Sequence, residues 1–240
     1  MQFTTIMENL PEMLKGAILS IQLLAITLIL GMCLAIPLAI LRVQKRPIFW
    51  RPVHWYIYFF RGTPLLAQLF LVYYGLAQLE FIRNSFLWIV LSRPYGCALL
   101  TFTLHTAAYT ANIIRGGIEA IPFGEVEAAR ACGMSNALLY RRILLPRAFR
   151  LALPAYSNEV VGMLKGTALV STITLVDLMG VARIVVAQTF AAYEMFITAA
   201  CIYLIITFVI TRIFYLVEYR LNRHLRPVKV KPLSLLKRPL

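Results

Sequence analysis

An uncharged run of 26 residues, from position 16 to position 41, constrains what this chain can fold into more than any other feature. A helix needs about 20 apolar residues to cross the hydrocarbon of a bilayer, and this run exceeds that length. Over its 240 residues the chain is 60% hydrophobic and 14% charged, a composition that excludes an ordinary soluble domain. The segment before the run is mildly acidic and no small-residue cleavage site follows it, so we expect a permanent span rather than a signal peptide.

Four more candidate spans follow the first. They cover residues 53–79, 94–114, 151–176 and about 190–211. We therefore expect an all-α integral membrane protein with five transmembrane helices, which form a single domain over residues 1–218. Residues 84–92 and 177–189 are too short to cross the bilayer, and we expect each to form a helix at the membrane interface.

Most of the 24 Lys and Arg residues lie in the segments that follow the first, third and fifth spans, on one side of the expected membrane. Cytoplasmic loops are enriched in Lys and Arg, so we expect the N-terminus outside and the C-terminus in the cytoplasm. Residues 219–240 then form a basic cytoplasmic tail. Because the basic residues flank spans instead of forming a patch with aromatic side chains, the net charge of +14 indicates membrane topology and not nucleic-acid binding.

Residues 119–146, between the third and fourth spans, form a charged segment that we place in the cytoplasm. Pro122 breaks the preceding helix, a second helix follows it, and Gly133 is placed to end that helix in a left-handed turn. Ser135 can cap a further helix, which we expect to stop near Pro146 and to lie, like the one before it, parallel to the membrane. Local chemistry leaves two interpretations open: a helix seated in a groove of another protein, or an amphipathic helix that only touches lipid headgroups.

The spacing within this segment follows the pattern EAA, three residues, G, nine residues, I, one residue and LP. Its fixed positions are Glu127, Ala128, Ala129, Gly133, Ile143, Leu145 and Pro146. This pattern resembles the signature loop of the membrane subunits of ATP-binding-cassette (ABC) importers. Three further stretches are similar to the polar amino acid branch of those permeases, particularly its histidine, arginine and opine members. They are FRGTPLLAQL (60–69), AAYTANIIRGGI (107–118) and LPAYSNEVVGMLKGTALVSTI (153–173).

The resemblance implies a type I ABC importer permease fold in a bacterial inner membrane. It implies uptake of a polar amino acid, with a basic one (histidine, arginine, lysine or ornithine) or an opine favoured. The loop would form a coupling helix, carrying Glu127, Ala128, Ala129 and Gly133, with Ile143, Leu145 and Pro146 as its scaffold. The implied partners are a cytoplasmic ATPase dimer that receives this helix, a second permease subunit, either a paralogue or a copy of this chain, and a periplasmic substrate-binding protein.

The chain contains no phosphate-binding GxxxxGKS or GxxxxGKT motif, so we expect ATP and Mg²⁺ to bind the partner ATPase. We expect this chain to be a transporter subunit and not an enzyme, with no cofactor of its own. Its four cysteines are isolated and lack the spacing of metal ligands, which predicts no metal site. An autonomous secondary transporter or channel is the alternative, yet five spans without duplicated halves are untypical of one.

Ionisable residues at membrane depth are costly and generally face protein or water. Arg61 begins the motif Arg61-Gly62-Thr63-Pro64, to which we assign a structural role. We expect Arg61 near the cytoplasmic end of the second span, where it either snorkels or binds the carbonyls freed by Pro64.

Two other spans carry candidate substrate-binding residues. Glu159, next to Asn158, could pair with a cationic solute or with a protein cation. Lys165 lies about 240° around the helix axis from Glu159 and does not share its face.

On the third span, His105, Tyr109 and Asn112 form one polar stripe, which could line a path or hold helices together. The related permeases usually carry an amide near position 105 and an acid at position 112, so His105 and Asn112 depart from their pattern. Asn112 is also the nearer of the two to the cytoplasmic end.

Overall fold

The computed structural model describes residues 3–44 and 47–221, and every regular element within these ranges is a helix. The α-helices are α1 (Phe3–Val43), α2 (Pro47–Gly62), α3 (Leu65–Phe70), α4 (Glu80–Arg83), α5 (Trp88–Leu91), α6 (Pro94–Glu119), α7 (Phe123–Ala131), α8 (Asn136–Leu139), α9 (Leu145–Gly166), α10 (Leu178–Thr189) and α11 (Ala192–Leu221). Two π-helical segments, η1 (Leu71–Gly75) and η3 (Tyr140–Leu144), and two 3₁₀ segments, η2 (Leu76–Gln78) and η4 (Thr167–Ile173), connect them. The all-α prediction is confirmed.

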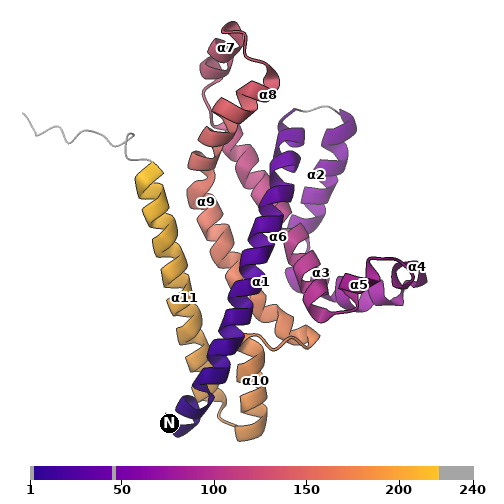
Figure 1. Cartoon of the computed structure of the whole chain (residues 1–240), viewed down its shortest axis with the longest axis vertical. Coiled ribbons are helices and arrows are strands. Elements are labelled where there is room, and N and C mark those ends of the chain that lie inside the picture. The colour runs from indigo at the N-terminus through magenta and orange to yellow at the C-terminus, as the bar shows by residue number, and fades with distance from the viewer. Residues whose placement is uncertain (1–2, 45–46, 222–240) are drawn as a thin grey trace, which may run out of the picture.

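The long helix α1 runs through the bundle with α6 and α9 beside it, while α7 and α8 extend beyond one end (Figure 1). Small side chains let α1 and α6 approach closely. Ala35 and Ala39 on α1 and Ala108 on α6 are fully buried in one apolar cluster. A Cβ atom on Gly31 would lie only 2.7 Å from Cγ2 of Thr106. These contacts make the α1–α6 pair the centre of the fold.

Three helices are long and apolar enough to cross a membrane within the described residues: α1, α6 and α11. A fourth span results if residues 136–173 and α10, which are bent by 47° relative to each other, count as one. The expected second span over residues 53–79 is not one helix, because the chain breaks between α2 and α3. The number of five spans therefore stays a prediction.

The break between α2 and α3 lies at Thr63 and Pro64. Pro64 has an extended backbone (φ −63°, ψ 137°) and precedes the first residue of α3. Proline has no N–H to donate and disfavours a helical conformation in the residue before it, so Thr63 and Pro64 interrupt the helix. The second expected span thus consists of α2, which has 16 residues, and a second helical part after the break, in which α3 continues into η1 and η2.

The two expected interfacial segments differ from each other. Residues 84–92 contain only the single-turn α5, whereas 177–189 correspond to the 12-residue α10. Asp177 caps α10, because its Oδ1 accepts a hydrogen bond from the Gly180 N–H at 2.9 Å. Its Oδ2 accepts a second from the Tyr203 hydroxyl at 3.2 Å, which ties the start of α10 to α11. At the other end of the chain, α11 continues to Leu221, and residues 222–240 of the expected tail lie outside the described residues.

Two adjacent glycines on α6 offer a matched test of its packing on α9. A Cβ atom on Gly117 would lie 2.6 Å from the Ala148 carbonyl oxygen, whereas one on Gly116 would meet nothing within 4 Å. We expect Gly117→Ala to lower the free energy of unfolding by about 1–3 kcal/mol, because the two backbones must separate. Gly116→Ala is expected to be neutral or to stabilise the helix by up to about 1 kcal/mol. Thermal unfolding in detergent measures both, and equal effects would contradict the proposed packing.

Candidate functional site: the loop before α9 and a polar cluster at a helix break

The loop between α6 and α9 forms the turn that the sequence predicts. Helix α7 follows Pro122 and ends at Ala131, and Gly133 adopts φ +77°. The Met134 N–H donates to the Ala129 carbonyl across this turn at 3.1 Å. The left-handed conformation of Gly133 is therefore confirmed, and it reverses the chain direction after α7.

The second predicted helix of the loop does not stop near Pro146. Ser135 caps α8, with its hydroxyl oxygen accepting from the Leu138 N–H at 3.4 Å, but α8 continues through η3 into α9. Pro146 directly follows the π turn of η3, whose wider helical ring accommodates the proline inside the continuous helix. The predicted helix-turn-helix parallel to the membrane is thus wrong in its second half. Only α7 is a separate helix, and residues from Asn136 onward are the beginning of α9.

The fixed positions of the loop divide into an outer and an inner set. Glu127, Ala128 and Gly133 are exposed, whereas Ala129 is buried against the cluster that joins α1, α6 and α9. The side chains of Ile143 and Leu145 pack against the same cluster, and Pro146 is exposed. The surface that α7 offers to a partner consequently includes Glu127 and Ala128 but not Ala129, which anchors α7 to the membrane helices.

An ion pair that sequence reasoning missed fixes α7 further. Arg147, at the start of α9, donates to the Glu125 carboxylate in the first turn of α7. The carboxylate is also favourably placed near the helix N-terminus.

The helix break at Pro64 is closed by Gln68, a residue that the sequence analysis did not single out. Its Nε2 donates to the carbonyl oxygens of Phe60 at 2.9 Å and Thr63 at 3.1 Å, and to Thr63 Oγ1 at 2.7 Å. The Phe60 carbonyl is the one that Pro64 leaves without its helical partner. The signal was present in the sequence, since Gln68 lies one helical turn after the proline.

Of the two roles predicted for Arg61, binding of the freed carbonyls is wrong, because Gln68 binds them instead. Arg61 lies in the last turn of α2, about 21 Å along the helix from Pro47. The snorkelling role and the position near the cytoplasmic end of the span stay predictions. Its guanidinium lies 5.3 Å from the ring centre of Tyr109, a cation–π contact between α2 and α6.

The polar stripe on α6 divides into two parts. His105 Nδ1 lies 3.0 Å from Gln68 Oε1, and the His105 ring stacks on Tyr109 with centroids 4.7 Å apart. Because the Gln68 amide nitrogen already donates to three oxygens, its oxygen faces His105, and Nδ1 of the imidazole carries the proton. Asn112 is not part of this cluster, since its oxygen accepts from Arg115 at 3.4 Å.

Glu159 and Asn158 lie on α9, one half-buried and the other exposed. Among the described residues no ion pair involves Glu159, and the charge that acts on it is that of Arg61. Lys165 makes no ion pair with it. An acid and a base from different helices thus face the same region of the bundle without touching. No group of three or more His, Cys, Asp or Glu side chains in residues 3–44 and 47–221 could hold a metal ion.

Comparison with known proteins assigns this arrangement to a class. The family described as "binding-protein-dependent transport system inner membrane component" matches residues 28–223. The chain belongs to this family, whose members are membrane permease subunits.

Relatives and solved structures agree with this assignment. The chain is 44% identical to the nopaline transport system permease protein NocM of Agrobacterium fabrum over 94% of each chain. It is 42% identical to the histidine/lysine/arginine/ornithine transport system permease protein HisM of Escherichia coli, over 88% of this chain and 90% of that one. Its fold is similar to that of a chain in an amino acid ABC transporter crystallised with histidines, with a TM-score of 0.81 and 32% identity over 92% of this chain and 99% of the other. The type I importer permease fold is thereby confirmed.

Gln68 offers a test of the helix break. We expect Gln68→Leu to lower the free energy of unfolding by about 1–3 kcal/mol per carbonyl left without a donor. The matched control is Gln78→Leu, because Gln78 is exposed at the end of η2. Thermal unfolding in detergent should separate the two variants. A Gln68→Leu protein as stable as the control would show that the carbonyls do not depend on this amide.

Proposed function

We propose that this chain forms the path for a polar amino acid, most suitably a basic one such as histidine, arginine, lysine or ornithine, or an opine, in an ATP-driven uptake system. One observation carries the choice of solute: the Glu159 carboxylate faces the bundle without a protein cation in contact, so a cationic solute can become its partner. The relatives named for nopaline and for histidine, lysine, arginine and ornithine transport support the same class.

In this proposal each polar residue of the cluster has a distinct role. Glu159 pairs with the cationic group of the solute, and the exposed amide of Asn158 lies next to it. Arg61, whose charge acts on Glu159, is placed to attract an anionic group of the same solute, such as its carboxylate. His105 and Tyr109 form an aromatic wall that Gln68 holds in position. Asn112 is separate from this group and belongs to the route toward the loop.

The loop is the element through which ATP binding and hydrolysis in a partner act on this chain. We infer that α7 is a coupling helix whose exposed Glu127, Ala128 and Gly133 contact a cytoplasmic ATPase dimer, while Ile143, Leu145 and Pro146 form its base on α9. ATP and Mg²⁺ bind that partner. A second permease subunit, a paralogue or a copy of this chain, and a periplasmic substrate-binding protein complete the transporter. The N-terminus then lies outside the inner membrane and the C-terminus in the cytoplasm.

Glu159 tests the solute class. We expect Glu159→Gln to reduce the uptake of a cationic amino acid about tenfold or more, because one charge-assisted hydrogen bond contributes about 1.5–3 kcal/mol. Uptake of a neutral amino acid by the same system should change far less. Transport of both in membrane vesicles with saturating binding protein measures the ratio. An equal loss for the two solutes would remove Glu159 from the solute site.

The turn at Gly133 tests the coupling role. We expect Gly133→Val to leave membrane insertion intact but to abolish transport-coupled ATP hydrolysis, since a β-branched residue is strained at positive φ. Gly124→Val is the control, because Gly124 lies in the same loop, at the start of α7, and neither glycine would meet an atom within 4 Å on gaining a Cβ. Co-purification with the ATPase and stimulated ATPase activity are measured. Normal coupling in the Gly133 variant would contradict the proposal.

A further inference from the structure

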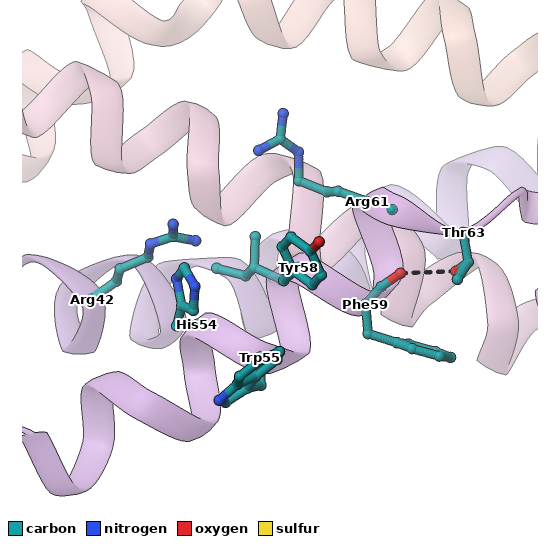
Figure 2. Close-up of a pocket in the computed structure, with 9 residues that line it drawn as sticks. Arg42, His54, Trp55, Tyr58, Phe59, Arg61 and Thr63 are labelled. Carbon is teal, nitrogen blue, oxygen red and sulfur yellow. Dashed lines mark hydrogen bonds between the residues drawn. The ribbon is translucent and has the colours of Figure 1, made fainter.

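A hollow of about 560 Å³ lies along α2 and shares Arg61 with the proposed solute site (Figure 2). Its lining residues are Arg42, His54, Trp55, Ile57, Tyr58, Phe59, Arg61, Gly62 and Thr63. The guanidinium of Arg42, at the end of α1, lies beside the His54 ring, and the aromatic side chains of α2 continue from there toward Thr63. The hollow therefore has a cationic end and an aromatic wall.

The cationic end lacks an anion of its own. Arg42 makes no ion pair among the described residues, and both Arg61 and Arg115 lie within its electrostatic reach. The one acid whose charge acts on Arg42 is Glu119, which is already bound through both oxygens by Arg115 at 3.1 and 3.0 Å. In addition, Nδ1 of His54 is buried and has no hydrogen-bond partner. Among the described residues, this end therefore combines a guanidinium that has no carboxylate partner with an imidazole nitrogen that has no hydrogen-bond partner, a combination suited to an anion.

The cationic end of the hollow is expected at the depth of the lipid headgroups, and its aromatic wall at the depth of the acyl chains. Arg42 directly follows the uncharged run 16–41, so it lies where the hydrocarbon ends and the phosphate groups begin. Further along α2, toward the bilayer centre, Trp55 and Tyr58 expose 66% and 65% of their surface and Phe59 exposes 46%. Large exposed aromatic side chains at this depth suit contact with an acyl chain and not with water.

We propose that this groove binds an anionic phospholipid of the cytoplasmic leaflet, with the phosphate between Arg42 and His54 and an acyl chain along Trp55, Tyr58 and Phe59. The leaflet rests on the orientation proposed above. A soluble anion would leave the aromatic wall uncovered. A second copy of this chain, seated symmetrically on the groove, would place its own Arg42 and Arg61 near those of the first copy, and these like charges would repel one another. An anionic lipid satisfies both ends, and basic pockets between helices on the cytoplasmic side bind such headgroups in other membrane proteins.

Tryptophan fluorescence reports directly on the groove. The chain has three tryptophans, and replacing Trp50 and Trp88 by phenylalanine leaves Trp55 in the lining as the sole emitter. The full-length chain is reconstituted in phosphatidylcholine vesicles that contain equal fractions of tail-brominated phosphatidylglycerol or tail-brominated phosphatidylcholine. We expect the apparent affinity for the brominated phosphatidylglycerol, read from the quenching of Trp55, to exceed that for phosphatidylcholine about fivefold.

Variants separate this site from general surface charge. Arg42→Gln should make the two lipids quench equally, whereas Arg42→Lys, which keeps the charge, should retain most of the preference. Arg51→Gln is the matched control, because Arg51 is an exposed arginine of α2 that does not line the groove. If Arg51→Gln removes the preference as fully as Arg42→Gln, the attraction is only that of a basic surface and the site is refuted.

Three further outcomes would also overturn the proposal. Equal quenching by the two lipids in the unmodified groove would show that no headgroup is selected. Absence of quenching by either lipid would show that protein, such as a second permease, covers the groove. Loss of the preference in millimolar inorganic phosphate would assign the site to a soluble anion.

The orientation is tested separately. Cys132 is exposed next to Gly133, and a membrane-impermeant maleimide should label it in inverted vesicles but not in intact cells. Because the quenching vesicles have the same lipids in both leaflets, a reversed orientation would change the leaflet named here without removing the lipid preference.

Discussion

The structure depends on the hydrogen bonding of its backbone. The hydrocarbon of a bilayer contains no water to bind backbone groups, so every N–H and C=O must find a partner within the protein. Between α2 and α3 the helix is interrupted, and Pro64 leaves the Phe60 carbonyl without a helical donor. One side chain, Gln68, repairs the break by donating to three oxygens. The same amide then orients His105 on α6, so the repair of the backbone and the arrangement of the polar cluster are one set of hydrogen bonds.

A second consequence follows from the continuity of α8, η3 and α9. The base of the loop that carries α7 and the carboxylate of Glu159 belong to one continuous helix that begins at Asn136. From Leu145 to Glu159 this helix rises by about 21 Å. We infer that a displacement of α7, which contacts this helix through the Glu125–Arg147 pair and the buried Ala129, moves the part that carries Glu159. Between Asn136 and Glu159 the helix contains the π turn at residues 140–144 and Pro154 within α9.

The sequence predicted the parts of this arrangement that depend on local chemistry. The helix start after Pro122, the left-handed Gly133 and the Ser135 cap each follow from one residue and its nearest neighbours, and each is present. The errors occurred where packing decides. Pro146 was expected to end a helix, but the wider π turn directly before it accommodates the proline inside a continuous helix.

The unbroken second span and the carbonyl-binding role of Arg61 failed for a related reason. Hydropathy alone does not reveal that a span is broken, since residues on both sides of Pro64 are apolar. Carbonyl binding was one of two roles predicted for Arg61. Gln68, one turn beyond the proline, binds the carbonyls instead, and a neutral amide is less costly to bury than a guanidinium. Which donor binds the carbonyls depends on the geometry of the break, which the sequence does not give.

The proposed solute site depends on Arg61 not being bound to the backbone. With the carbonyls satisfied by Gln68, the guanidinium lies over the Tyr109 ring, and its charge acts on Glu159 without an ion pair. In a direct pair the two charges would satisfy each other, and a solute would have to separate them before it could bind either. In the proposed function, two opposite charges held apart by different helices remain available, and a solute that carries both an ammonium or guanidinium and a carboxylate can pair with them. We infer that movement of α9 against α2 changes their separation, which would link the position of the loop to the affinity for the solute.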